Sequence, residues 1–174
     1  MDWSIGRLIV HHPAAHNING SIVHSYLSIP VGGNFGPLQG ANLTTLQNRL
    51  RGIHYIVIDK KSMISLRLLS QIDSRLRQAC PSRKDDWFGG YSLFMFGDFF
   101  QLPPVGEKPL FHNAPSKEPE VDGKQAYDSI DQTLALAAIV RQEGDEQAPF
   151  REVLQALRTG QATLQHWALL STRV

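Results

Sequence analysis

The sequence predicts an α/β domain built on a mainly parallel sheet. Short apolar runs typical of strands alternate with longer segments in which apolar residues recur at helical spacing, which is the pattern of strands joined by crossover helices. Two of the strand-like runs are followed by a carboxylate, at Asp59 and Asp98. Since such sheets bind ligands beyond the carboxyl ends of their strands, we expect both residues to lie near one site.

The first half of the chain predicts two strands and a helix. An apolar run over Arg7–Val10 indicates a strand, and the Pro-, Asn- and Gly-containing segment Pro13–Gly20 indicates the loop after it. Asn42–Leu50 carries leucines at helical spacing. Ile53–Asp59 is nearly continuous in apolar and β-branched residues, so we expect a strand buried on both faces.

The second half continues the alternation. Leu66–Ala79 is an amphipathic helix that Pro81 ends, Tyr91–Phe96 predicts a second buried strand, and Glu107–Gly123 is typical of a long surface loop. The remaining expected elements are a strand over Leu134–Val140 and helices over Phe150–Leu157 and Leu164–Leu170.

Composition limits the classes of function. The 17 basic and 16 acidic residues give a formal charge of +1, so any nucleic-acid contact must be local. The single cysteine, Cys80, cannot form an internal disulfide and is interpreted as a packing residue. No apolar run approaches the roughly 20 residues needed to cross a bilayer, and no targeting signal is seen. We therefore expect a soluble, intracellular protein without a membrane partner.

Two segments could carry chemistry. Ile56–Met63 has the form of a Walker B element, an apolar strand followed by an aspartate that supports a nucleotide-bound Mg²⁺, although Asp59 could instead cap the next helix. In Gly97–Val105 two prolines follow Gln101 and hold it on a stiff extended loop at the sheet edge, where its amide could sense a phosphate. The neighbouring Phe99 and Phe100 are either core residues or stacking platforms for bases.

Together these blocks resemble motifs II and III of petite-integration-frequency (PIF) type and RecD-like DNA helicases of superfamily one. The resemblance implies a RecA-like P-loop NTPase domain, with helices flanking a mainly parallel sheet, that binds ATP and Mg²⁺. In that family Asp59 would hold the metal and Gln101 would sense the γ-phosphate.

Two further segments extend the resemblance over nearly the whole chain. Ala14–Ser25 is similar to motif Ia, which implies single-stranded DNA contacts at Asn19, Ser21, His24 and Ser25. The other interpretation makes Ser21 a helix cap and His24 a core residue. Ile139–Gln142 is similar to the motif IV region, which implies that Arg141 approaches the γ-phosphate. We therefore expect residues 1–140 to form a partial RecA-like domain and residues 141–174 to contain motif IV and the start of a link to a second such domain.

The sequence departs from the family pattern in two ways. No Walker A loop, GxxGxGK followed by Ser or Thr, occurs in the 174 residues, so we expect a domain that is incomplete at its N-terminus. Lys60 stands at the catalytic position directly after Asp59, where the family carries a glutamate that acts on the attacking water. A lysine cannot accept that proton while charged, and it would repel Mg²⁺ unless it turns outward or binds a phosphate.

Three functions remain open. The first is a fragment of an ATP-dependent DNA helicase. The family resemblance implies roles in repair, recombination and telomere maintenance, in the nucleus or the mitochondrion. The chain alone would be inactive and would bind DNA weakly. The second is a degenerate, non-enzymatic relic of such a helicase, from a mobile element. The third is an unrelated α/β binding module, against which the Gly97–Val105 block argues.

Overall fold

The structure is a computed structural model that describes residues 5–9, 20–136 and 144–172. It divides into two compact units, Met1–Asp131 and Gln132–Val174. The larger unit holds all the strands of the described part and the helices packed on them, whereas the smaller unit is helical. The predicted domain boundary at residue 140 stays a prediction, since residues 137–143 lie outside the described ranges.

The larger unit is an α/β domain, as predicted. Its four-stranded parallel sheet has the order β2-β1-β3-β4, formed by β1 (Ile5–Ile9), β2 (Ser21–Ile22), β3 (Tyr55–Asp59) and β4 (Ser92–Met95). The register pairs Ile9 with Asp59 and Ile58 with Met95, so the strands end at a common edge. The non-consecutive neighbours require crossovers, and these are made by the helices.

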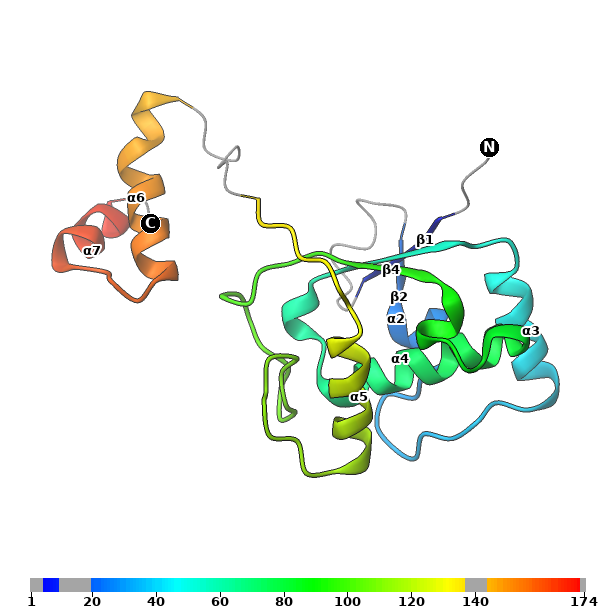
Figure 1. Cartoon of the computed structure of the whole chain (residues 1–174). Helices are drawn as coiled ribbons and strands as arrows, with labels where there is room; N and C mark the ends of the chain where they lie inside the picture. The colour runs from blue at the N-terminus through cyan, green and yellow to red at the C-terminus, as the bar shows by residue number, and fades with distance from the viewer. Residues whose placement is uncertain (1–4, 10–19, 137–143, 173–174) are drawn as a thin grey trace. The chain divides into compact units, whose positions relative to one another are not determined.

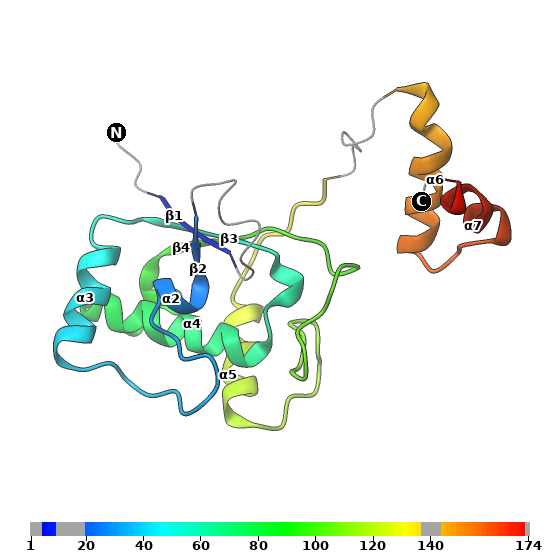
Figure 2. The same cartoon turned by 180° about the vertical axis from the view of Figure 1, so that it is seen from behind.

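The helices of this unit lie on one side of the strands (Figures 1 and 2). They are α2 (Val23–Tyr26), α3 (Gly40–Leu50), α4 (Leu66–Ala79) and α5 (Glu118–Asp128), with α5 packed against α4. Residues on the sheet face toward them, such as Leu8, Ile56 and Ile58, are fully buried beside Leu69 and Ile72 of α4. Alternation along the strands therefore places the core between the sheet and α4.

α4 is the central helix of the core, and its bounds match the sequence prediction. Ser65 caps its N-terminus, accepting a hydrogen bond from the Leu68 N–H at 3.0 Å. Arg75 is 2% exposed and donates to the carbonyls of Ser28 and Gly36, while its guanidinium lies 4.2 Å from the centre of the Phe35 ring. This buried cation ties the segment between α2 and α3 to the core.

The structure corrects three predictions about this unit. β4 is not buried, because it forms one edge of the described sheet and its Phe94 is 48% exposed on the face away from α4. Burial of β3 on both faces is also wrong, since Tyr55 and Val57 are only half-buried although β3 is an inner strand. Part of the predicted loop Glu107–Gly123 is helical: α5 starts at Glu118, where Pro119 suits the first helical turn.

The smaller unit contains α6 (Ala148–Arg158) and α7 (Leu164–Ser171), confirming the two predicted closing helices. Thr163 caps α7 in a reciprocal capping box with His166. The predicted strand Leu134–Val140 is not present over residues 134–136, where Leu134 and Leu136 are more than 90% exposed, and residues 137–140 lie outside the described part. In neither unit does any described helix have both the length and the apolar character needed to span a bilayer.

Candidate nucleotide and DNA site

Asp59 ends β3 at the common carboxyl edge of the strands. Its Oδ1 accepts a hydrogen bond from the Lys60 N–H at 2.8 Å, and Lys60 adopts a left-handed conformation with φ 65°. This sharp turn directs the chain into the short 3₁₀ helix η2 (Lys61–Met63) and on to α4. The alternative in which Asp59 caps the next helix is wrong, because Ser65 caps α4 and no side chain caps η2.

Backbone hydrogen bonds join the Asp59 turn to the loop after β4. The Phe96 N–H donates to the Ile58 carbonyl, and the Lys61 N–H donates to the Phe96 carbonyl, both at 2.8 Å. Gly97 then passes so close that a Cβ on it would lie 2.8 Å from the Lys61 nitrogen. The structure thus brings together the two segments that the sequence singled out, although they are far apart along the chain.

The loop that carries Gln101 is organised by Asp98. The Asp98 carboxylate accepts from the Phe100 N–H at 3.1 Å, and the Asp98 carbonyl accepts from the Gln101 N–H at 3.0 Å. The resulting turn leaves Gln101 exposed beyond the sheet edge. A side-chain amide in this position is accessible to a ligand, and the stiff Pro103-Pro104 segment follows it.

The two phenylalanines of this loop have different environments. Phe99 is half-buried, lies against the core and contacts the Lys61 ammonium at 4.7 Å from its ring centre. It also packs edge-to-face on Phe111 at 5.4 Å. Phe100 is 67% exposed. The core interpretation therefore fits Phe99, and a stacking role remains open for Phe100.

Glu107 anchors the same loop to the start of α4. Its carboxylate accepts a hydrogen bond from the Ser65 hydroxyl and lies 3.9 Å from Arg67. The adjacent backbone is also fixed, because the Leu66 N–H donates to the Lys108 carbonyl at 2.9 Å. Sequence reasoning missed Glu107, since nothing about a lone glutamate in a Pro- and Lys-rich segment indicates its partners.

Three of the four expected DNA-contact residues are described, and they lie in β2 and in the helix that follows it. Ser21 is in β2, while His24 and Ser25 are in α2. Burial lowers the pKa of His24 and the Glu107 carboxylate raises it, with burial the larger effect. His24 therefore interacts electrostatically with the loop that carries Gln101. Ser21 is not a helix cap, since α2 has Ile22 at that position without a side-chain bond.

Arg49 stabilises this region and was not predicted from sequence. Its guanidinium donates to the carbonyls of Ser25 and Tyr26 and lies 5.3 Å from the centre of the Tyr26 ring. α3 thereby holds the short helix α2 in place. The remaining expected residues, Asn19 and Arg141, lie outside the described ranges.

The metal-binding capacity of this edge is small. Within the described ranges no three His, Cys, Asp or Glu residues are grouped so that they could hold a metal ion. Asp59 uses one carboxylate oxygen on the Lys60 N–H, which leaves the other for a ligand. A single carboxylate fits Mg²⁺ that arrives on nucleotide phosphates and retains its own waters, and it does not fit a resident metal held by the protein alone.

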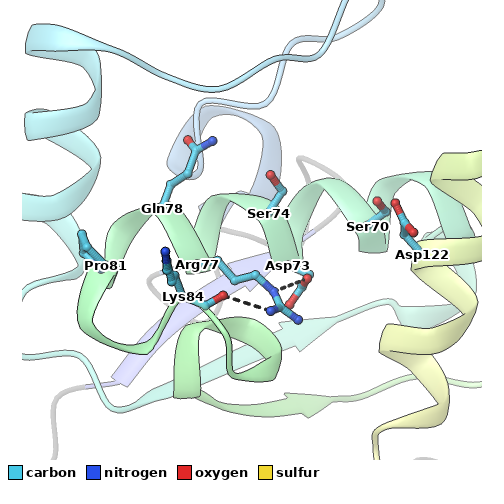
Figure 3. Close-up of a pocket in the computed structure, with 8 residues that line it drawn as sticks. All are labelled: Ser70, Asp73, Ser74, Arg77, Gln78, Pro81, Lys84 and Asp122. Atoms are coloured by element: carbon cyan, nitrogen blue, oxygen red, sulfur yellow. Dashed lines mark hydrogen bonds and ion pairs between the residues drawn. The ribbon is translucent and has the colours of Figure 1, made fainter.

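A separate hollow of about 400 Å³ on the outer side of α4 is not part of this site (Figure 3). Two of its charged groups are paired: Arg77 binds Asp73 at 2.6 Å, and it also donates to the Lys84 carbonyl at 3.0 Å. The Arg77 guanidinium also covers the Trp87 ring at 4.7 Å. These contacts join α4 to the segment before β4, so the hollow has a structural explanation.

Comparison with known proteins identifies what this arrangement is similar to. The PIF1-like helicase family matches residues 13–166. The chain is 32% identical over 150 residues to the ATP-dependent DNA helicase PIF1 of Saccharomyces cerevisiae, covering 84% of this chain and 16% of that protein. It is 29% identical over 160 residues to the ATP-dependent DNA helicase RRM3 of the same organism, covering 87% of this chain and 20% of that protein.

Solved structures of Pif1 helicases are also similar to this chain. The Pif1 helicase from Bacteroides in complex with ADP-AlF3 and single-stranded DNA superposes with a TM-score of 0.71 at 28% identity, over 98% of this chain and 40% of that chain. The Pif1 helicase from Candida albicans has a TM-score of 0.65 at 24% identity, over 94% of this chain and 35% of that chain. The 174 residues thus span well under half the length of the proteins that they match.

Proposed function

This chain belongs to the family of PIF1-like helicases, and from that premise we propose that it forms part of the nucleotide- and DNA-binding machinery of an ATP-dependent DNA helicase. The whole protein would couple ATP hydrolysis to the unwinding of DNA. The observation that carries the proposal is the joining of the Asp59 turn to the Gln101 loop by the Lys61–Phe96 backbone bond.

In this proposal each residue has a distinct role. Asp59 supports Mg²⁺ through its free carboxylate oxygen, and Gln101 senses the γ-phosphate from its exposed turn. Arg141 stabilises the charge of the same phosphate. The metal, when bound with ATP, neutralises phosphate charge, and the residues of this chain orient it.

DNA binding is assigned to residues 19–25, which include β2 and the start of α2. Asn19, Ser21, His24 and Ser25 would contact the backbone of a single strand, and the similar Pif1 helicase from Bacteroides was crystallised with single-stranded DNA. The formal charge of +1 supplies little general attraction for a polyanion. Binding by this chain alone is therefore expected to be weak and to decrease steeply with salt.

The wider assignments rest on the family. We propose that residues 1–140 are a partial RecA-like domain, and that residues 141–174 carry motif IV and begin the link to a second such domain. Roles in DNA repair, recombination and telomere maintenance, in the nucleus or the mitochondrion, are proposed on the same basis.

Lys60 favours a second candidate function. An ammonium group stands where the family carries a glutamate, next to the carboxylate that would support Mg²⁺. Like charges about 4 Å apart repel by roughly 4 kcal/mol at an effective dielectric of 20, which would weaken metal binding. The alternative is therefore a non-enzymatic relic that keeps the fold and a weak nucleic-acid or protein contact.

A nucleotide titration distinguishes these candidates. A fluorescent ATP analogue with Mg²⁺ is titrated into the 174-residue chain and into the chain fused to a Walker A strand, loop and helix, with Asp59→Ala in the fusion as the control. We expect binding by the fusion and its loss in Asp59→Ala, with no ATP turnover by the chain alone or by its Lys60→Glu variant. Failure of the fusion to bind favours the relic. Turnover by the unfused chain that survives Asp59→Ala would contradict both assignments.

A further inference from the structure

A cavity of about 610 Å³ lies at the end of the sheet opposite to Asp59. Residues at the amino ends of β3 and β4 line it, together with the turn after α3 and the segment after α4. Its volume is within the range of about 300 to 1,000 Å³ that small-molecule sites occupy in proteins. It shares no residue with the nucleotide and DNA site described above.

The charged side chains that line this cavity are all basic. These are Arg51 and Arg83, the imidazole of His54 lies beside them in the wall, and no carboxylate lines it. Arg83 is partly neutralised, since it pairs with Asp86 outside the wall at 2.8 Å. In the part of the chain that the structure describes, no hydrogen bond or ion pair involves Arg51, which is exposed. The cavity therefore concentrates positive charge that nothing in its wall compensates.

The local backbone is built to hold the Arg83 guanidinium at the wall. Arg83 donates to the Gly90 carbonyl at 2.9 Å. Gly90 has φ +72°, and a Cβ on it would lie 2.0 Å from the central carbon of that guanidinium. A side chain at this position would strain the left-handed backbone and displace the guanidinium, so glycine suits it. The guanidinium has N–H groups beyond those that donate to Asp86 and Gly90, and such donors can bind a phosphate.

The rest of the wall offers space for a ring. Tyr91 is half-buried there, and Leu50 and Ile53 provide apolar surface. Basic groups at one part of a cavity with an aromatic and aliphatic remainder match a ligand that carries a phosphate and a flat, weakly polar base.

We propose that this cavity binds a nucleotide through its phosphate group, at a second site distinct from the one at Asp59. The chemistry is that of a nucleoside monophosphate, supplied either as a free nucleotide or as a nucleotide at the end of a nucleic-acid strand. Arg51 and Arg83 bind the phosphate, and Tyr91 lies beside the base. This proposal does not depend on the proposed helicase activity, because it involves none of the residues assigned to it.

Calorimetric titration of the 174-residue chain tests the proposal. The probes are adenosine monophosphate, inorganic phosphate and a single-stranded ten-residue oligothymidylate, all with EDTA so that Mg²⁺-dependent binding at Asp59 is suppressed. Arg51→Gln removes the cation without a known intramolecular partner, and Lys84→Gln, an exposed cation next to Arg83 but outside the wall, is the matched control. Circular dichroism confirms that both variants are folded.

We expect the monophosphate or the oligonucleotide to bind, with affinity about tenfold lower in Arg51→Gln and unchanged in Lys84→Gln. Binding of the monophosphate identifies a free nucleotide as a sufficient ligand, and binding of the oligonucleotide alone identifies a strand. The proposal is overturned if neither binds, if Arg51→Gln binds as well as the parent chain, if both variants lose affinity equally, or if inorganic phosphate binds as tightly as the nucleotide.

Discussion

Replacing Gly97 by alanine should destabilise the fold more than the same replacement at Gly106, the other glycine of the loop after β4. Gly97 has φ +143°, a region that costs a residue with a Cβ about 1 to 3 kcal/mol. The new Cβ would also lie 2.8 Å from the Lys61 nitrogen, which donates to the Phe96 carbonyl. Relief of that overlap stretches or breaks this bond, at about 0.5 to 1.5 kcal/mol. The expected loss is the sum of the two effects, about 1.5 to 4.5 kcal/mol.

Gly106→Ala is the control for the backbone part of this effect. Gly106 lies in the same loop with φ +69°, and a Cβ on it would meet no atom within 4 Å. Its substitution should cost only the left-handed conformation, about 1 to 2 kcal/mol. The measurement is urea unfolding of both variants and the parent chain by circular dichroism, with linear extrapolation to water. A Gly97→Ala loss within about 0.5 kcal/mol of the Gly106→Ala loss would show that the close approach of the two segments is not present.

Two further predictions concern buried groups. Asp73→Asn should lower the free energy of unfolding by about 2 kcal/mol, because the Asp73 carboxylate accepts from the Phe88 N–H and from Arg77, both at 2.6 Å. Denaturant unfolding measures this loss of stability. A loss no larger than that caused by Asp128→Asn, at an exposed carboxylate, would contradict the prediction. Burial lowers the pKa of His24, so the folded state favours the neutral ring. The stability that the neutral His24 ring contributes is complete at pH values above its ordinary pKa of about 6.5. This contribution is lost as the pH falls below that value. Between pH 7 and pH 5 the parent chain should therefore lose more stability than His24→Gln, and parallel pH profiles would refute this.

The spacing of apolar residues was sufficient to predict a helix where one of its faces is buried and the other is exposed. The α4 bounds could be predicted to the residue, because its leucines recur at helical spacing and Pro81 prevents its continuation. Helical spacing of apolar residues also predicted α6 and α7, although α7 has no buried residue. α5 was missed, since Pro and Lys suggest a loop, and its helical state depends on close packing against α4: a Cβ on Gly123 would lie 1.8 Å from the Leu66 carbonyl oxygen. Such proximity is a property of the packed pair and leaves no periodic signal.

The sequence by itself determined the α/β class, the places of Asp59 and Gln101 after their strands, and the family, because these depend on local pattern and on residues close in the chain. The tertiary structure decided which loops meet. Only the folded chain joins Lys61 to Phe96, links Ser65 and His24 to Glu107, and assembles a basic cavity from Arg51 and Arg83. Contacts between residues far apart in sequence follow from strand order and helix packing, and a one-dimensional pattern of side chains does not specify them.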